Sequence, residues 1–200
     1  MRLAQAHPTW VLGFEDEVWW SRLAQPEQHR WVGEGERTRL QEVERAKEDK
    51  QAKALACHGV LVRQAAQQDR MLLRFVDGRP VSDVTIEFLA WCSERLAEQG
   101  VTAWLLIWDN ASWHKSEKGR IWLREHNRRV KATGTGVRIV GCLLPSKSPW
   151  LNPIEPKWGH GKRAVSEPER VLTAEELEGR VCAYYGCSRE AHLLMPQKVA

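Results

Sequence analysis

Prolines recur at four-residue intervals in the segment 144–158, LPSKSPWLNPIEPKW, and they decide where a helix can begin there. These prolines are Pro145, Pro149 and Pro153. Each fixes its own φ and disfavours helical geometry in the residue before it, so we expect an extended loop as far as Asn152. A helix can start only after this loop, with Asn152 as its cap, Pro153 in the first position and Glu155 in the first turn. The segment therefore places one acid on a rigid corner, where it could complete a capping box, complement the helix dipole or serve a metal ion.

Two further acids follow apolar runs that resemble buried strands. The run AWLLIW at 103–108 is apolar on both faces, as in a central strand of an α/β sheet, and Asp109 comes directly after it. Ligand and catalytic groups in open α/β sheets collect at this end of a strand, although an Asp there is also a common turn former or helix cap. The run WVLGF at 10–14 resembles a second strand, and we expect it to end at the acid pair Asp16 and Glu17.

Asp16, Asp109 and Glu155 are therefore three separated carboxylates, each on an element able to hold it still. Three converging carboxylates repel one another unless cations neutralise them. Oxygen ligands with few His or Cys companions favour Mg²⁺ or Mn²⁺ over zinc. Paired ions of this kind catalyse in-line displacement at phosphodiesters, so the pattern indicates phosphoryl transfer.

Three segments together carry a family resemblance: FEDE at 14–17, DNASWH at 109–114 and the proline-rich segment 144–158. In content and order they resemble the catalytic blocks of bacterial insertion-sequence transposases in the mariner-like superfamily, which are DDE endonucleases. The resemblance covers about residues 9–165. It implies an α/β fold of the ribonuclease-H-like type, with a mixed sheet flanked by helices. It also implies that Asp16, Asp109 and Glu155 form a catalytic triad that binds two Mg²⁺ or Mn²⁺ ions.

Polar residues inside these blocks are candidates to support the triad. They are Glu17, Asn110, His114 and Asn152, and we expect them to hydrogen-bond or orient the three acids. His114 could also cap a helix or contact DNA. We favour capping or a bond to the acids, because the triad is complete without His114.

Basic residues are concentrated in the second half of the chain. Between residues 115 and 163 there are twelve Lys or Arg and three Glu, as a phosphate backbone would require. We expect Lys147, Lys157, Lys162 and Arg163, which bracket Glu155, to contact DNA. The implied partner is double-stranded DNA, both at element terminal repeats and at the target.

Tryptophan is abundant, with eleven residues in the chain. Trp113, Trp150 and Trp158 lie inside the motif blocks, where they could pack the corner or stack on a splayed base. We expect packing for all three.

Periodicity and turn residues predict the order of elements along the chain. We expect strands at 10–14, 18–23, 54–64, 70–76, 103–108 and 137–143, and helices at 82–99, 115–128, after 152 and at 173–185. The domain organisation would be a short remnant at 1–8, a catalytic domain at 9–165 with a charged insertion at 34–53, and a C-terminal helix and tail at 166–200. The segment 189–200 carries no clear structural signal.

The chain departs from the family pattern in two places. There are 45 residues between Asp109 and Glu155, more than is usual, and only fifteen residues precede Asp16, too few for the helix-turn-helix region that the family normally carries there. We therefore expect a split, truncated or assisted protein, with an upstream helix-turn-helix polypeptide and a homodimer as possible partners. The alternatives are a catalytically silent DNA-binding remnant of a decayed element, and a plain nuclease of the same fold.

Several other classes are disfavoured by composition. No apolar run is long enough for a membrane span and the first residues lack a signal-peptide core, so we expect a cytoplasmic protein without a membrane partner. The five cysteines include no Cys-x-x-Cys pair, which argues against a disulfide framework or a structural zinc site.

Overall fold

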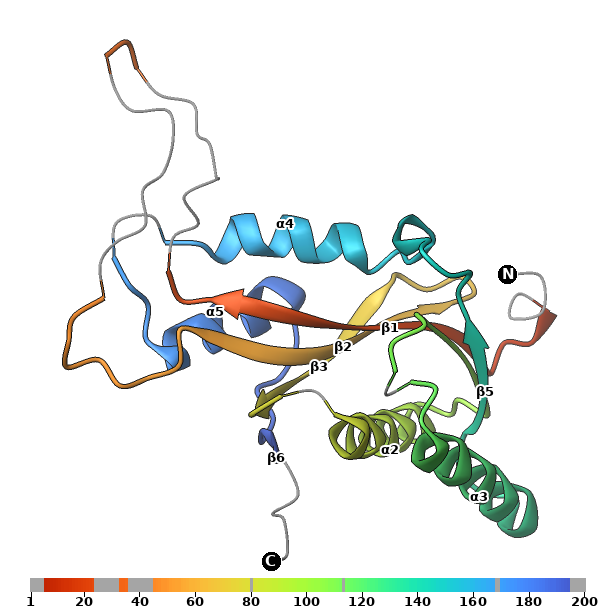
Figure 1. Cartoon of the computed structure of the whole chain (residues 1–200). Coiled ribbons are helices and arrows are strands. Elements are labelled where there is room, and N and C mark those ends of the chain that lie inside the picture. Colours follow the sequence, from red (N-terminus) through yellow and green to blue (C-terminus); the bar gives the residue numbers. More distant parts are fainter. Residues whose placement is uncertain are drawn as a thin grey trace, which may run out of the picture.

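A mixed six-stranded sheet runs through the molecule with helices on both faces (Figure 1). The computed structural model describes residues 6–23, 33–35, 45–79, 81–112, 114–167 and 170–194. The strands are β1 (Trp10–Ser21), β2 (Ala54–Gln64), β3 (Arg70–Asp77), β4 (Ala103–Trp108), β5 (Arg138–Leu143) and β6 (Leu193–Leu194). Their order in the sheet is β5-β4-β1-β2-β3-β6. The first three strands pair antiparallel, and β4 and β5 add in parallel beside β1, which is the ribonuclease-H-like arrangement that the sequence predicted.

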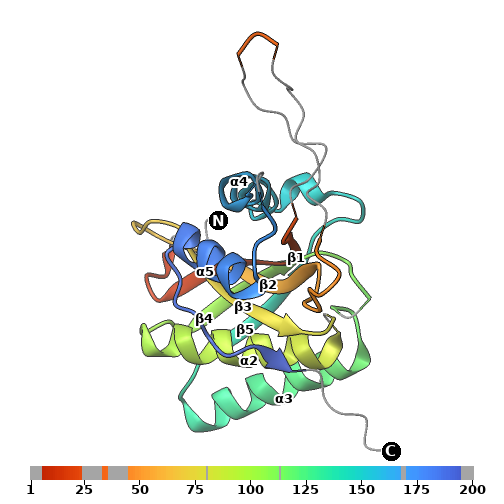
Figure 2. The ribbon, with the colours of Figure 1, turned by 90° about the vertical axis from the view of Figure 1, so that its left-hand side faces the viewer.

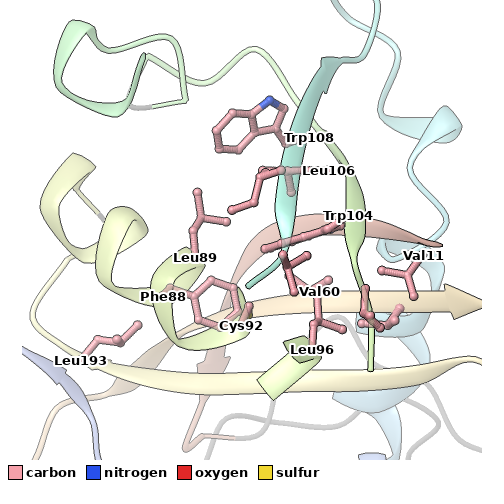
Figure 3. Close-up of a cluster of buried hydrophobic side chains, with 14 of the residues drawn as sticks. Val11, Val60, Phe88, Leu89, Cys92, Leu96, Trp104, Leu106, Trp108 and Leu193 are labelled. Carbon is pink, nitrogen blue, oxygen red and sulfur yellow. The ribbon is translucent and has the colours of Figure 1, made fainter. Parts of the chain in front are cut away.

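Helices cover the two faces of the sheet in pairs (Figure 2). The first pair is α2 (Ser82–Glu98) and α3 (Glu117–Thr133), and the second is α4 (Glu155–Val165) and α5 (Ala174–Tyr185). A buried cluster fills each interface. Figure 3 shows the first cluster, in which Phe88, Leu89 and Leu96 of α2 face Val60 and Trp104 of the sheet. The second cluster packs α4 and α5 against the opposite face of β1, β2 and β3.

Strand β1 is one continuous strand, whereas the sequence predicted a break at the acid pair and a separate strand at 18–23. Its pairing with β2 runs unbroken from Val11 to Ser21. The strand continues because its side chains alternate between two buried environments: Phe14 and Val18 enter the α4 face, and the intervening Glu15 is fully buried on the other face. Asp16 thus lies within the strand and does not end it.

The helices agree with the sequence patterns except near their ends. Helix α2 is confirmed, and α5 begins with the predicted capping box between Thr173 and Glu176. Helix α3 ends at Thr133, five residues later than expected, where Gly134 adopts the left-handed conformation. At the end of the described residues, Leu193–Leu194 pairs with β3 as β6, although the segment 189–200 carried no sequence signal.

The corner before α4 also differs from expectation. A short 3₁₀ turn, η1 (Pro149–Leu151), precedes the helix, which begins at Glu155 with Ile154 in the capping position. Asn152 does not cap this helix. Its side-chain amide instead donates to the Glu15 carbonyl oxygen at 3.3 Å, which ties the corner to β1. The predicted cap was wrong because the Asn152 side chain bonds this carbonyl group instead. The carbonyl lies 137 residues away in sequence, so the local pattern could not indicate it.

None of the described helices is both long and apolar enough to cross a membrane. The charged insertion predicted at 34–53 is described only at 34–35 and 45–53, so most of that prediction lies outside the described residues.

Candidate active site

The three predicted acids come from β1, from the end of β4 and from the first turn of α4. The parallel pairing of β1 with β4 ends at Phe14 and Ile107. Asp16 and Asp109 each lie two residues beyond that last pair, so they occupy matching positions where β4 ends. Asp109 and Glu155 line one pocket of about 410 Å³. Its wall also includes Asn110, Asn152, Lys147 and the backbone of the corner that leads into α4.

Trp158 of α4 connects Asp16 to the helix above it. The indole Nε1 donates to Asp16 Oδ2 at 2.9 Å, and the ring is buried. The ring contacts Trp20 and Tyr185 edge to face. Gly59, paired with Asp16 across β1 and β2, makes room for it, because a Cβ there would lie 2.4 Å from Trp158 Cη2. Packing of Trp158 is thus confirmed, and it also orients a candidate catalytic acid.

Negative charge is concentrated around Asp16. Burial, together with the neighbouring carboxylates of Glu155, Glu15 and Glu17, raises the pKa of Asp16 to about 8, against the lowering effect of the Trp158 hydrogen bond. A carboxylate in this position is stabilised by a nearby cation. Glu155 is thus one of the charges that act on Asp16, although Asp16 does not line the pocket.

A second polar cluster lies on the opposite face of β1. The fully buried Glu15 carboxylate lies 3.0 Å from His58 Nδ1 and 3.0 Å from His114 Nε2, and Glu17 Oε1 lies 3.2 Å from His114 Nε2. Burial opposes the charge on His114, but hydrogen bonds to Glu15 and Glu17 outweigh it and raise the pKa of His114 to about 11. Burial likewise opposes ionisation of Glu15, but the two imidazoles lower its pKa to about 2. The cluster is therefore a charge-compensated network.

His114 also joins this network to Asp109. Its Nδ1 lies 2.8 Å from Asp109 Oδ1, and the Ala111 backbone N–H donates to the same oxygen at 2.8 Å. Asn110, the next residue, donates through its side chain to the Leu144 carbonyl oxygen. These contacts fix the orientation of the Asp109 carboxylate and the loop that carries it.

The sequence placed Glu17, Asn110, His114 and Asn152 beside the acids, and the structure brings each of them to this region. It missed Glu15 and His58. Both stand within apolar strands, and a charged residue at an inward-facing strand position was the available signal.

Two groupings in this region differ in how closely their ligand atoms approach. Among the described residues, Glu15, Glu17 and His58 form the one group of three or more His, Cys, Asp or Glu whose ligand atoms all lie within 4.8 Å. Asp16, Asp109 and Glu155 do not meet that limit.

The four basic residues predicted to contact DNA lie on the corner and on α4. Lys147 is exposed, lines the pocket and has a positive φ of 58°. Lys157 and Arg163 are exposed, and Lys162 is half-buried. All three share α4 with Glu155. A larger pocket of about 740 Å³ between α3 and β5 reaches His114 but contains none of the three acids.

A mixed sheet with acids on two adjacent parallel strands, and a third acid on a helix across them, defines a ribonuclease-H-like nuclease domain. The family model for the DDE superfamily endonuclease matches residues 12–178, and the chain belongs to this family. No match was found among curated protein sequences.

Solved structures with a similar fold include several complexes of one transposase. The Mos1 transposase paired-end complex with the left transposon end is 15% identical with a TM-score of 0.58, and the alignment covers 90% of this chain and 48% of that one. The mariner Mos1 paired-end complex with Mg is 14% identical with a TM-score of 0.55, covering 88% and 47%. The Mos1 strand transfer complex is 14% identical with a TM-score of 0.53, covering 90% and 48%. The chain thus spans about half the length of the transposase that it resembles.

Proposed function

We propose that this chain is a transposase catalytic domain that cleaves and joins DNA by metal-dependent phosphoryl transfer, with Asp16, Asp109 and Glu155 as the metal ligands. The observation that carries the proposal is their arrangement. Asp109 and Glu155 line one pocket, and Asp16, in the matching position beside Asp109, is hydrogen-bonded by Trp158 of the helix that Glu155 begins. Carboxylates gathered in this way are suited to hold cations.

The donor set fits Mg²⁺ or Mn²⁺, because the proposed ligands are all carboxylate oxygens. When bound, a pair of such ions activates the attacking oxygen and stabilises the leaving oxygen at a phosphodiester. The protein's own contribution is orientation. Trp158 holds Asp16 through its indole N–H, and His114 holds Asp109 through Nδ1. Lys147, on the pocket wall, would contact a phosphate of the bound strand.

Transposition is favoured over simple nuclease activity by the fold neighbours. The Mos1 structures are described as paired-end and strand transfer complexes, and the present chain shares their fold over most of its length. We further propose that two copies act together on element ends and target DNA, with sequence choice supplied by a helix-turn-helix region on the same or another polypeptide. The element would be a bacterial insertion sequence and the chain would act in the cytoplasm.

The test is nicking of supercoiled plasmid by the purified chain in Mg²⁺, in Mn²⁺ and in chelator. We expect Asp109→Asn and Glu155→Gln to lower the rate by more than about 100-fold, because each removes charge that the cation needs. Glu125→Gln, an exposed substitution on α3, removes the same charge elsewhere and should leave the rate unchanged. Undiminished nicking by Asp109→Asn protein would show that Asp109 is not a ligand.

A further inference from the structure

Trp150 is the most exposed large hydrophobic side chain in the described part of the chain, with 76% of its surface accessible. The packing role predicted from sequence was therefore wrong for this residue. Leu151 beside it is also exposed, at 47%. Two adjacent exposed apolar side chains form a contiguous surface, and contiguous apolar surface, unlike a single exposed side chain, marks sites of interaction.

The backbone under Trp150 is firmly held. Within η1, the Leu151 N–H donates to the Ser148 carbonyl and the Asn152 N–H to the Pro149 carbonyl, at 3.1 and 2.8 Å. Asn152 and Ile154, which follow the turn, are buried. The backbone at Trp150 is held by these bonds, and the Trp side chain has only two rotatable bonds. Ordering the ring on binding therefore costs little conformational entropy.

The position of the turn links this ring to the active site. Ser148 and Pro149, directly before Trp150, line the pocket that contains Asp109 and Glu155. Trp150 does not line the pocket itself, and its exposed ring follows directly on lining residues, at the rim of the pocket. A strand whose phosphate lay in the pocket would bring its nearest bases to this rim.

We propose that Trp150 is a stacking platform for an unpaired base of the DNA end, next to the phosphate that the three acids would bind. The inference rests on the proposed function. Paired bases within a duplex already stack on their neighbours, so the open face of an unpaired base is the surface that a rigid exposed ring can cover. Stacking of this kind tolerates any base sequence, because every base has a π-face. Lys147, on the same corner, supplies the complementary charge for the backbone.

The first experiment compares the affinity of the chain for two DNA duplexes of the same arbitrary sequence. One has blunt ends, and the other ends in a fork with a few unpaired nucleotides. A chelator is present so that no cleavage occurs. We expect the wild-type chain to bind the fork about 10-fold more tightly, and Trp150→Ala to lose that preference. Trp150→Phe should keep most of it. Tyr184→Ala on α5, where the ring is 45% exposed and away from the pocket, is the matched control and should behave as wild type.

The second experiment locates the contact. Fork DNA carrying 5-iododeoxyuridine at an unpaired position is irradiated with the protein, which is then digested with trypsin. The peptide 148–157 contains Trp150 as its only aromatic residue, and we expect the crosslink in that peptide. A crosslink confined to other peptides, or a fork preference that survives in Trp150→Ala, overturns the proposal. A third outcome also overturns the proposal: Trp150→Ala keeps the fork preference but changes the protein from dimer to monomer in sedimentation. The ring would then contact a second copy of the chain and not a base.

These outcomes separate the stacking proposal from the proposed function. If plasmid nicking requires Asp109 while Trp150→Ala keeps the fork preference, the function stands and the stacking fails. If the wild-type chain binds neither duplex, both fail.

Discussion

At the scale of single residues, the glycine opposite Asp16 determines where the aromatic ring beside that acid can lie. Gly59 is in register with Asp16, and a Cβ there would lie 2.4 Å from Trp158 Cη2 and 2.9 Å from Leu73 Cδ2. Neither neighbour has room to move, because Trp158 and Leu73 are both buried. The absence of one methyl group thus allows the indole N–H to reach Asp16.

Gly59→Ala tests this dependence. We expect a loss of about 1 to 3 kcal/mol in the free energy of unfolding, since overpacking a filled core forces side chains out of place. Plasmid nicking should fall further than the fraction of folded protein does, because a displaced Trp158 releases Asp16. Gly179→Ala is the control. A Cβ at Gly179 meets nothing within 4 Å, and alanine in the interior of α5 should be neutral or slightly stabilising. An unchanged melting curve for Gly59→Ala would contradict the packing argument.

At the scale of elements, β1 places two different polar sites on its two faces. Asp16 faces α4, while Glu15 and Glu17 face the side on which His58 and His114 lie. His114, on the second of these faces, contacts both Glu15 and Asp109. The strand therefore carries a candidate metal ligand on one face and, on the other, the support for a second ligand.

Strand β1 also shows which features of the fold the sequence could predict and which it could not. Apolar runs identified β4 and β2, and helical spacing identified α2, because those patterns depend on nearby residues. The acids of β1 were predicted to end the strand, because nothing near them in sequence could compensate a buried charge. The residues that do so, His58 and His114, are far away along the chain. Sequence could nominate Asp16, Asp109 and Glu155 as candidate ligands, whereas charge compensation between remote residues appears only in the folded chain.

The titration of these groups predicts how stability depends on pH without divalent cations. Asp16 has a pKa of about 8 in the folded chain against an ordinary 3.8, and His114 about 11 against 6.5. A group whose pKa is raised by folding adds to stability while the pH is below its unfolded pKa. That contribution is lost as the pH rises to its folded pKa. Glu15, lowered to about 2 from 4.5, loses its contribution only as pH falls through that range. Stability should therefore be greatest near pH 4, between the ordinary pKa values of Asp16 and Glu15, and should fall as the pH rises above it.

Urea unfolding in chelator at pH 6 and at pH 9 measures that fall. We expect Asp16→Asn to reduce the difference by at least about 1 kcal/mol, since each pKa unit corresponds to about 1.4 kcal/mol. Glu125→Gln should leave it unchanged. Adding Mg²⁺ should recover more stability at pH 9 in wild type than in Asp16→Asn. Equal pH dependence in both proteins would show that the carboxylates around Asp16 do not interact as the structure implies.

At the scale of the whole molecule, the two faces of the sheet carry different basic surfaces. Helix α4 bears Lys157, Lys162 and Arg163 beside Glu155, whereas α3 bears Arg128 and Lys131 on the opposite face (Figure 1). Only the α4 set shares an element with a candidate metal ligand. DNA seated at the three acids would therefore run along α4, and the charges of α3 would stay in solvent.

Replacing both Lys162 and Arg163 with Ala tests this orientation. Each phosphate contact releases condensed counterions, so removing two should lower the salt slope of DNA affinity by up to about 2 and weaken all sequences about equally. The Arg128→Ala, Lys131→Ala double variant removes the same charge from α3 and should change the slope little. Fluorescence anisotropy with two unrelated duplexes across a range of salt concentrations measures both effects. If the α3 variant lost as much slope as the α4 variant, binding would depend on net charge and not on the face that holds the three acids.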